Sequence, residues 1–207
     1  MATAVEAWER YGAKVKPRRV TNSAGATTWF NWTQYPDHGP NESLLGDIRG
    51  KRVLELGSGS GANLAHLATL GAHCVGVDLA PSRRDAGRER WGHLRNLEFV
   101  VGDVLDFLPQ AEGFDVIYSV FGAVWFVEPA KLLPLVRSSL LRGGVFAFSH
   151  LPPNGLEGPT AGKAVTKWHY SPTRWVELLV RHGFQAEADV IPAPVAGPGT
   201  MLVRARS

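Results

Sequence analysis

The sequence predicts an α/β domain with a doubly wound, mostly parallel sheet of seven strands. Across residues 51–150, short apolar runs of strand length alternate with segments of helical periodicity, which is typical of repeated β-α units. Helix-length connections of this kind give parallel strand pairs with right-handed crossovers. Only the turn-rich residues 192–199 separate the last two predicted strands, which predicts an antiparallel hairpin at one edge of the sheet.

The predicted strands are short apolar runs that end at glycine or at a polar residue. The first runs directly into a glycine-rich loop, and the second ends at an aspartate, so both end in residues that suit a ligand site. The seven predicted strands cover residues 52–56, 73–78, 97–101, 114–119, 145–149, 184–191 and 200–206.

The predicted helices lie between these strands. Ser171 followed by Pro172 is typical of a helix cap with proline in the first turn. Pro134 is unfavourable inside an unbroken helix, because it lacks an N–H and clashes with the preceding turn. We therefore expect the third helix to have a loose first turn, to become regular near Leu133 and to end at Gly143-Gly144. The four predicted helices cover residues 61–70, 83–91, 129–141 and 172–182.

Residues 1–50 differ from the rest of the chain, because aromatic side chains stand among polar ones without clean periodicity. We expect them to form an N-terminal helix and a short aromatic lid on a single domain that occupies residues 51–207. Trp8 and Tyr11 are expected to pack that helix onto the sheet. The residues expected to form the lid and to line a substrate pocket beneath it are Trp29, Trp32 and Tyr35.

The bulk composition excludes several classes of protein. The chain has 207 residues, a net charge of +3 and a single cysteine, so neither an intrachain disulfide nor a Cys-rich metal site is possible. The N-terminus lacks the apolar core of a signal peptide, and no apolar stretch reaches the length of about 18 residues that a membrane span needs. We expect a cytoplasmic protein without a membrane segment; the sequence carries no signal for its oligomeric state.

The strongest functional signal is the loop after the first strand, where Gly57, Gly59 and Gly61 alternate with Ser58 and Ser60. Glycine serves where the backbone turns sharply or a ligand approaches the main chain, and strand ends in doubly wound sheets open onto the ligand crevice. The spacing G-x-G-x-G differs from the dinucleotide fingerprint G-x-G-x-x-G. A carboxylate at position 55, just before the loop, repels phosphate and favours a ligand with a cationic, amino-acid-like tail.

Two further acids follow the next two strands and suit a nucleoside. Asp78 ends the second strand, where a carboxylate can accept hydrogen bonds from both ribose hydroxyls. Asp103 follows the third strand, where its carboxylate can accept a hydrogen bond from an exocyclic adenine amine. Together with their neighbours Leu79 and Val104, these acids predict that a nucleoside lies across the strand ends.

Residues 53–150 resemble the class I S-adenosylmethionine-dependent methyltransferases. The loop from Glu55 to Gly61 matches the first motif of that family, Asp78 its ribose-binding acid, and Asp103-Val104 its adenine-contacting pair. The resemblance implies a Rossmann-like sheet in the order 3-2-1-4-5-7-6 with strand 7 antiparallel. It also implies S-adenosyl-L-methionine as cofactor and S-adenosyl-L-homocysteine as product, and the segment after the fourth strand resembles a subgroup of small bacterial enzymes. The residues expected beside the methionine part of the cofactor are Ser119, Val120, Phe121 and Trp125, of which Phe121 and Trp125 are also expected in the substrate pocket.

Several residues are candidates for a general base at the same edge of the sheet. His150 is the best placed, since it ends the fifth strand and a histidine titrates near neutral pH. The alternative is that it only shapes the pocket. His38, His169 and Tyr170 are further candidates, each of which could equally be an ordinary loop residue. No paired spacing of histidines and acids indicates a metal site.

Three functions stay open at this point. The first is methyl transfer to N, O or C of a small, aromatic or partly apolar metabolite. The second is methylation of RNA or protein, although residues 119–122 lack the Asp/Asn-Pro-Pro-Tyr/Phe sequence of nucleic-acid amino methyltransferases. The basic clusters at 14–19 and 83–95 fit solvated faces better than a dedicated nucleic-acid site, because the net charge is mild. The third is a non-catalytic scaffold that binds the cofactor.

Overall fold

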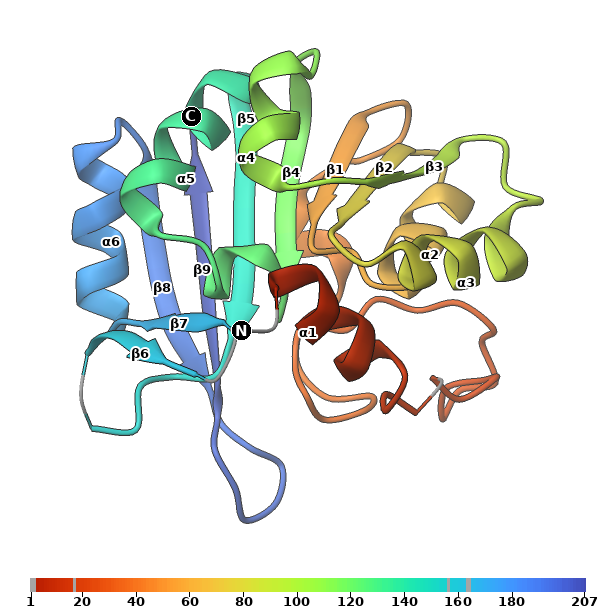
Figure 1. The fold of residues 1–207 in the computed structure, drawn as a ribbon, viewed down its shortest axis with the longest axis horizontal. Helices are drawn as coiled ribbons and strands as arrows, with labels where there is room; N and C mark the ends of the chain where they lie inside the picture. Colours follow the sequence, from red (N-terminus) through yellow and green to blue (C-terminus); the bar gives the residue numbers. More distant parts are fainter. Residues whose placement is uncertain (1–2, 17, 156, 163–164) are drawn as a thin grey trace.

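The computed structural model describes residues 3–16, 18–155, 157–162 and 165–207, and its centre is one seven-stranded sheet (Figure 1). The strand order is β3-β2-β1-β4-β5-β9-β8, which is the order that the resemblance implied once β8 and β9 are counted as the sixth and seventh strands. The strands are β1 Arg52–Leu56, β2 His73–Asp78, β3 Leu97–Val101, β4 Phe114–Val120, β5 Leu140–His150, β8 Gln185–Ile191 and β9 Thr200–Arg206.

The strand directions also confirm the prediction. Strands β1 to β5 pair in parallel, whereas β9 is antiparallel to both of its neighbours, β5 and β8. The carboxyl ends of the parallel strands therefore meet at one edge, which is the lower edge in Figure 1.

Six α-helices are described, and three single-turn 3-10 helices accompany them. Ser171 caps α6 as predicted, because its side chain accepts a hydrogen bond from the Arg174 N–H. Within the described residues, no helix has the length and apolar character needed to cross a membrane. The helices are α1 Ala4–Gly12, α2 Ala62–Thr69, α3 Pro81–Trp91, α4 Val104–Phe107, α5 Pro129–Ser139 and α6 Pro172–Arg181, with η1 Glu42–Leu45, η2 Leu108–Gln110 and η3 Ala123–Trp125.

The expected loose first turn of α5 is wrong. The helix is regular from Pro129 onward and continues through Pro134 to Ser139. Pro134 is tolerated because it lies on the exposed face, as does Ala130, so water can reach the carbonyl group that has no N–H partner. The chain then enters β5 at Leu140, earlier than predicted, and the pairing register shifts along this first part of the strand.

A second, two-stranded sheet was not predicted. It is the hairpin of β6, Gly158–Ala161, and β7, Thr166–His169. Its strands are only four residues long, and the surrounding glycine and proline residues gave no alternating pattern to recognise. Figure 1 shows that the hairpin and α1 both lie at the carboxyl edge of the sheet.

The two faces of the main sheet are covered differently. Alternate residues of a strand point to opposite faces. On one face Leu54, Ile117 and Phe146 pack with the apolar sides of α4, α5 and α6 in the larger core cluster. On the other face Val53, Val116 and their neighbours pack against α2 and against the N-terminal part of the chain. Among the described residues, the 3-10 helix η1 is the helical element that contacts this face of β5, so the N-terminal region has to supply the remaining layer.

That layer is residues 29–38, which we call the aromatic segment, and the expectation that Trp29, Trp32 and Tyr35 line the pocket is wrong. Trp32 is fully buried, its indole N–H donates to the Asn41 carbonyl, and its ring packs against Tyr118 on β4. The Ser149 hydroxyl on β5 donates to the Trp32 carbonyl at 2.6 Å. Trp32 is therefore a core residue between the segment and the sheet.

The remaining two residues of the expected lid are also structural. Trp29 is buried, and the guanidinium of Arg18 lies 4.4 Å from the centre of its ring. The Tyr35 hydroxyl donates to the Pro198 carbonyl at 2.9 Å and so ties the segment to the β8–β9 loop. Neither side chain lies on the cavity described below.

Helix α1 was expected to pack Trp8 and Tyr11 onto the sheet, and that expectation is wrong as well. None of its residues is buried, and Tyr11 is 61% exposed. The helix instead contacts α3 and the segment after β4. Glu9 accepts a hydrogen bond from the Ser82 N–H, and Trp8 packs edge-on against Phe126. It therefore lies over the carboxyl edge of the strands.

Candidate cofactor and active site

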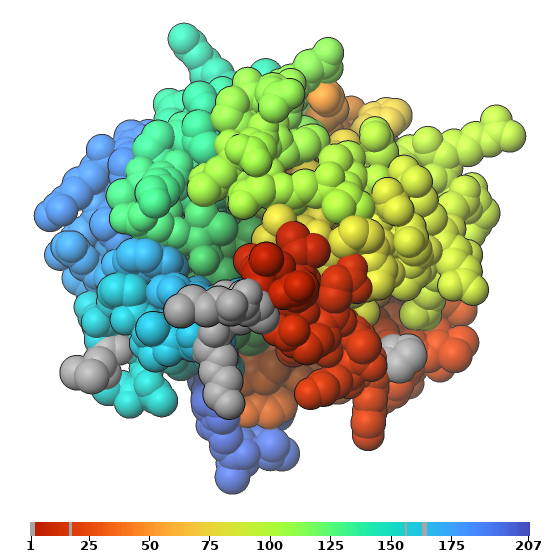
Figure 2. Space-filling view, in the orientation of Figure 1, coloured from red at the N-terminus to blue at the C-terminus, as the bar shows by residue number. Residues whose placement is uncertain are grey.

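A cavity of about 900 Å³ opens at the carboxyl edge of the parallel strands. The ends of β1, β2 and β3 and the loops that follow them form one wall. Helix α1, the segment after β4 and residues Val165 and Thr166 complete the lining. Figure 2 shows α1 crossing this face of the molecule between α3 and the hairpin. The volume lies at the upper end of the range of about 300–1,000 Å³ for small-molecule pockets, so it suits a cofactor together with an acceptor.

The glycine loop, residues 57–61, forms the turn between β1 and α2. Gly57, Gly59 and Gly61 have φ angles of +77°, +54° and +70°, which side-chain-bearing residues rarely adopt. A Cβ atom at Gly57 would lie 2.5 Å from the Ala123 nitrogen, and one at Gly61 would overlap the Phe99 ring. A Cβ atom at Gly59 would have only the Arg83 guanidinium near it, at 3.8 Å. Two of the glycines thus allow protein segments to approach each other, and the third leaves room for a ligand.

Asp78 lies at the end of β2 on the cavity wall. Its Oδ2 accepts a hydrogen bond from the Gly59 N–H at 2.8 Å, and its Oδ1 accepts one from the Ala80 N–H at 2.9 Å. Burial raises the pKa of this carboxyl above its usual range, against these two hydrogen bonds. Each carboxylate oxygen offers two lone-pair directions, so both oxygens can still accept a hydrogen bond from a ligand hydroxyl.

Asp103 lies beside Asp78 on the same wall and caps α4. Its Oδ1 accepts a hydrogen bond from the Leu105 N–H at 2.9 Å. Leu79 and Val104 line the cavity with these two acids, and Ser58 lines it from the glycine loop, so the structure brings together the residues predicted for the nucleoside.

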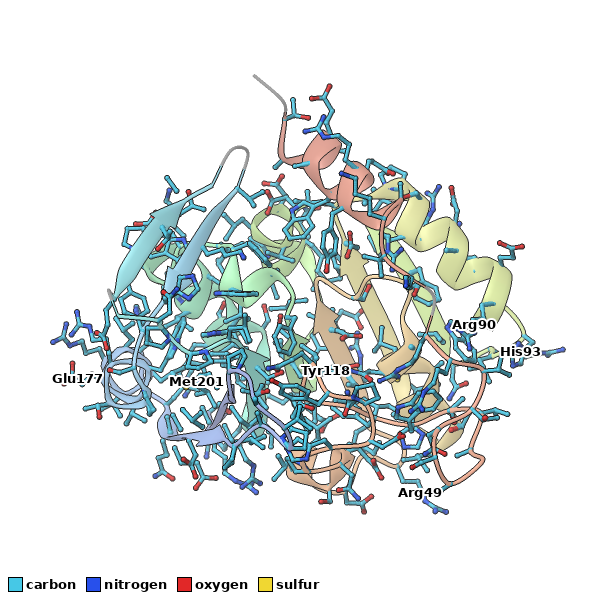
Figure 3. All side chains as sticks on the ribbon, turned by 90° about the horizontal axis from the view of Figure 1, so that it is seen from below. Arg49, Arg90, His93, Tyr118, Glu177 and Met201 are labelled. Atoms are coloured by element: carbon cyan, nitrogen blue, oxygen red, sulfur yellow. The ribbon has the colours of Figure 1, made fainter. Side chains whose placement is uncertain are left out.

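Glu55 lies at the base of the cavity and is almost completely buried. Its Oε2 accepts a hydrogen bond from the Tyr118 hydroxyl at 3.0 Å. Burial raises the pKa of the Glu55 carboxyl to about 8, opposed by the Tyr118 hydrogen bond and by the charge of Arg18. Figure 3 shows Tyr118 in the interior of the molecule, which is why the pair is shielded from solvent. A cationic group placed beside Glu55 would favour its charged form.

Two residues expected beside the cofactor lie behind the cavity wall instead. Ser119 is buried, and its hydroxyl donates to the Leu56 carbonyl at 2.7 Å, so it joins β4 to the end of β1. Trp125 is also buried, with its ring stacked on His150 and its indole N–H directed at His169. Val120 and Phe121 do line the cavity. Phe121 has a φ angle of +50°, a strained conformation for a residue other than glycine.

His150 does not reach the cavity. It is fully buried among Trp125, Phe148 and Trp175, and its Nδ1 lies 2.7 Å from the Leu151 carbonyl oxygen. Burial lowers the pKa of the imidazole to about 4, so it is neutral at pH 7. A neutral ring with Nδ1 facing a carbonyl carries its proton there, which leaves Nε2 as an acceptor. The structure thus gives His150 no route to an acceptor in the cavity.

The other candidate bases also lie away from the cavity. His38 Nε2 lies 2.8 Å from the Pro192 carbonyl oxygen, on the outer side of the aromatic segment. His169 accepts from Trp125, and Tyr170 packs edge-on against Trp175 at the start of α6. Burial raises the pKa of the Tyr170 hydroxyl and lowers that of the His169 imidazole. Among the residues that the structure describes, no histidine lines the cavity.

Sequence reasoning expected the N-terminal region to cover the cavity, but it assigned the wrong side chains of that region to the cavity lining. The guanidinium of Arg18, the side chains of Asn31 and Thr33, and Trp8 of α1 line the cavity instead. These residues come from loops and from a short helix, where no periodicity or motif marks a residue as facing a ligand. The one available signal was the presence of Arg18 in a basic cluster, which we interpreted as a solvated face.

The residues present fit an adenosyl amino acid. Asp78 keeps lone pairs for two ribose hydroxyls, and the second oxygen of Asp103 accepts no hydrogen bond from any described residue. Gly59 leaves space where a side chain would lie, and Glu55 offers a carboxyl group to a cationic tail.

Comparison with known proteins agrees with this site. Residues 53–144 match a family described as a methyltransferase domain. The chain is 35% identical over 97 residues to a demethylmenaquinone methyltransferase of Clavibacter sepedonicus, a match that covers 47% of this chain and 40% of that protein. It is 30% identical over 126 residues to a trans-aconitate 2-methyltransferase of Variovorax paradoxus, covering 58% and 47%. The matched region thus spans less than half the length of these two relatives.

Solved structures match over a larger share of the chain. An S-adenosylmethionine-dependent methyltransferase from Mesorhizobium loti has a TM-score of 0.66 at 24% identity, covering 80% of this chain and 95% of that one. The 1,6-didemethyltoxoflavin-N1-methyltransferase of Burkholderia thailandensis, solved with 1,6-didemethyltoxoflavin and S-adenosylhomocysteine bound, also has a TM-score of 0.66 at 23% identity, covering 80% and 74%. The family match covers less than half of the chain, and together with these solved structures and the sheet order it shows a Rossmann-like fold of the methyltransferase type.

Proposed function

We propose that this protein binds S-adenosyl-L-methionine and transfers its methyl group to N, O or C of a small organic acceptor. The observation that carries the proposal is that Gly59, Asp78 and Asp103, which follow three neighbouring strands of the sheet, all line one cavity. The solved relative with S-adenosylhomocysteine bound supports the same cofactor.

The cofactor supplies a methyl group on a positively charged sulfur, which is already electrophilic. The protein then has to align the acceptor with that group and to exclude water, and alignment alone can contribute about 7–11 kcal/mol to the rate. Helix α1, Val165 and Thr166 complete the lining of the cavity, which suits both tasks. Since no described histidine reaches the cavity, we propose that binding and orientation, rather than a histidine base, carry most of the catalysis.

The acceptor is proposed to be aromatic or partly apolar. The part of the cavity away from the glycine loop is lined by Trp8, Phe126, Val127 and Val165, with the Glu128–Lys131 ion pair as its polar feature. The relatives are named for acceptors as different as demethylmenaquinone and trans-aconitate, which supports a small molecule without choosing one. Because α1 and the hairpin cover the cavity, a small acceptor also fits better than a nucleic acid, and we propose the cytoplasm as its location.

The proposal is tested by binding first and by transfer second. Titration calorimetry with S-adenosylhomocysteine is expected to show one site, and Gly59→Val is expected to abolish it, because that side chain enters the open space at the loop. Radiolabelled S-adenosylmethionine is then offered with a panel of aromatic and carboxylic metabolites. Transfer to at least one of them is expected. Failure of the wild-type protein to bind would refute the proposal, whereas tight binding without transfer across the panel would favour the non-catalytic scaffold.

A further inference from the structure

The hairpin of β6 and β7 contributes to the cavity although it lies outside the main sheet. Among the described residues, its two strands pair with each other and with no strand of that sheet. Val165, just before β7, and Thr166, the first residue of β7, line the cavity. Most of β6 is exposed, whereas β7 is half-buried and contacts η3 at the carboxyl edge of the sheet (Figure 1). The place of this part of the cavity wall therefore depends on what holds β7 to η3.

Trp125 is the residue of η3 that β7 contacts through two side chains. Its indole N–H donates a long hydrogen bond of 3.4 Å to His169 Nδ1, and the Lys167 ammonium lies 4.4 Å from the centre of its ring. Lys167 and His169 are two residues apart, so they lie on the same side of the strand. Among the described hydrogen bonds, the one to His169 is the only one that joins the two hairpin strands to the rest of the fold. Trp125 is thus the main polar attachment of the hairpin.

Trp125 is itself held by the sheet and by the segment after β4. Its ring is stacked on that of His150 in β5, with 5.6 Å between the ring centres and 9° between the planes. Phe121, which lines the cavity with a φ angle of +50°, packs edge-on against Trp125 at 6.0 Å. The buried indole is therefore in contact with β5 and with β7 at once, and it fixes the hairpin relative to the sheet.

The hydrogen bond from Trp125 requires a neutral His169. A neutral imidazole that accepts at Nδ1 carries its proton on Nε2, whereas a protonated ring has an N–H on both nitrogens and no acceptor. Burial and the charge of Lys167 lower the pKa of the His169 imidazole from its ordinary value of 6.5. The titratable groups that face it are Lys167 on its own strand and His150 on β5, while η3 and β6 carry none. The attachment is therefore intact at neutral pH and is lost as His169 becomes charged.

We infer that Trp125 is a positioning residue that holds the hairpin at the acceptor part of the cavity, a role that rests on the proposed function for what binds there. Trp125 does not line the cavity itself and acts through His169 and Lys167. Val165 and Thr166 keep their place on the cavity wall as long as this contact is intact. Its loss is expected to weaken recognition of the acceptor and to leave cofactor binding at β1, β2 and β3 unchanged, because the hairpin does not belong to that wall.

Hydrogen exchange of the hairpin amides, measured by mass spectrometry on the whole protein with S-adenosylhomocysteine, tests this attachment. Trp125→Phe keeps an aromatic ring beside His150 but lacks the indole N–H. It is expected to lower the protection of the hairpin about 3- to 10-fold at pH 7.5, the size of one hydrogen bond. In the wild-type protein, protection is expected to fall at least about twofold between pH 7.5 and about 5, as His169 becomes charged. His150, whose pKa is about 4, stays mostly neutral over this range.

His169→Asn separates the charge of the ring from its hydrogen bond. The Oδ1 atom of asparagine lies near the position of Nδ1 and accepts a hydrogen bond at every pH. This variant is expected to keep the protection of the hairpin at pH 7.5 and to lose its pH dependence. Trp125→Phe is expected to lose most of the pH dependence as well, whereas a Trp125 that only supported the fold would leave it intact.

Trp168→Phe is the matched control, because it removes the neighbouring tryptophan from the other side of β7. It is expected to keep the pH dependence of the wild-type protein. With the acceptor that the metabolite panel identifies, Trp125→Phe is expected to raise KM about 3- to 10-fold. Its affinity for S-adenosylhomocysteine is expected to stay within about twofold of the wild-type value, since the two sites are separate. Trp168→Phe is expected to change neither quantity.

Hairpin protection that is equal in Trp125→Phe and the wild-type protein, or a pH dependence that persists in His169→Asn, would overturn the inference and leave the proposed function standing. A wild-type protein that does not bind S-adenosylhomocysteine would overturn the proposed function, and exchange measured without that compound then decides the attachment alone. If Trp125→Phe does not fold, the wild-type pH profile and His169→Asn decide it.

Discussion

The glycine loop and the aromatic segment both carry conspicuous residues, but these residues have different surroundings. The loop lies on the cavity, and its backbone adopts left-handed φ angles at Gly57, Gly59 and Gly61. The aromatic segment turns its largest side chain, Trp32, away from the cavity and into the core between itself and the sheet. The glycine loop therefore leaves space for a ligand, whereas Trp32 of the aromatic segment fills space in the core.

The difference shows that one part of the fold forms the ligand site and another part completes the core. The sheet ends at β1, β2 and β3 provide a ligand wall from residues close in sequence. On the other face of the sheet, the short 3-10 helix η1 and the irregular aromatic segment cover β4 and β5, and large side chains such as Trp32 fill that space. The predictions below test this division, beginning with the largest expected effect.

Trp32→Ala is expected to lower the free energy of unfolding by about 3–5 kcal/mol, because it leaves a large cavity in the core. Chemical denaturation measures it. Tyr35→Ala is the control in the same segment. It loses a hydrogen bond to the Pro198 carbonyl at a partly exposed position and is expected to cost about 1 kcal/mol. If Trp32→Ala kept its stability and lost only activity, the segment would be a lid after all.

Gly61→Ala is expected to destabilise the protein by at least about 2 kcal/mol, because the residue has a φ angle of +70° and the new methyl group overlaps the Phe99 ring. Gly59→Ala sharpens the comparison. Its methyl group comes no nearer than 3.8 Å to Arg83, so about 1–2 kcal/mol of backbone strain is the whole expected cost. Equal losses of stability in the two variants would contradict the separate roles of the two glycines.

Asp78→Asn is expected to weaken binding of S-adenosylhomocysteine about 10- to 100-fold, because an amide offers one acceptor oxygen where the carboxylate offers two. Calorimetry measures this directly. Asp106→Asn, on the exposed side of α4, removes a nearby negative charge and is expected to leave the affinity unchanged. An unaffected Asp78→Asn would place the ligand somewhere other than the wall of β1, β2 and β3.

The pH dependence of stability is expected to reveal Glu55. Burial raises its pKa from 4.5 to about 8, so its contribution to stability is present at low pH and is lost as the pH rises through 8. Relative to Glu55→Gln, the wild-type protein is expected to lose up to about 1.4 kcal/mol per pH unit between pH 6.5 and 8. His150, whose pKa of about 4 is lowered by burial, acts in the opposite direction and below pH 6.5, outside this range. Parallel curves for the two proteins would mean that Glu55 is ionised throughout.

The sequence was sufficient to predict the elements whose signals are local. The run from Arg52 to Gly61 carries its strand, its turn and the start of its helix in ten consecutive residues, and Asp78 and Asp103 lie at ends of strands that their own apolar runs mark. The order of strands follows from the resemblance and from the crossover rule. All of these were confirmed in the structure.

The placement of the aromatic side chains was not predictable in this way. Whether an aromatic side chain faces a ligand or a core depends on elements distant in sequence, which are β4 and β5 for Trp32, and His150 and His169 for Trp125. The same holds for His150, where a position at the end of a strand suggested the cavity, although Trp125 and Trp175 enclose the ring. Arg18 was interpreted as part of a solvated face, and that interpretation was wrong. A charged residue in a basic cluster gives no sequence signal that its side chain is partly buried.

The hydrogen bond from Ser149 to the carbonyl of Trp32 limits how far the chain can be shortened from its N-terminus without exposing the core. A fragment that began at Lys51 would keep every strand and every cofactor motif, and by sequence it would be a complete catalytic unit. It would also leave one face of β4 and β5, with Val116, Tyr118 and Ala147, bare to water. We expect such a fragment to aggregate, because a contiguous exposed apolar surface favours association between molecules. The packing of Phe30, Trp32, Leu45 and Ile48 on the sheet therefore makes this part of the chain necessary for folding, whatever it contributes to the site.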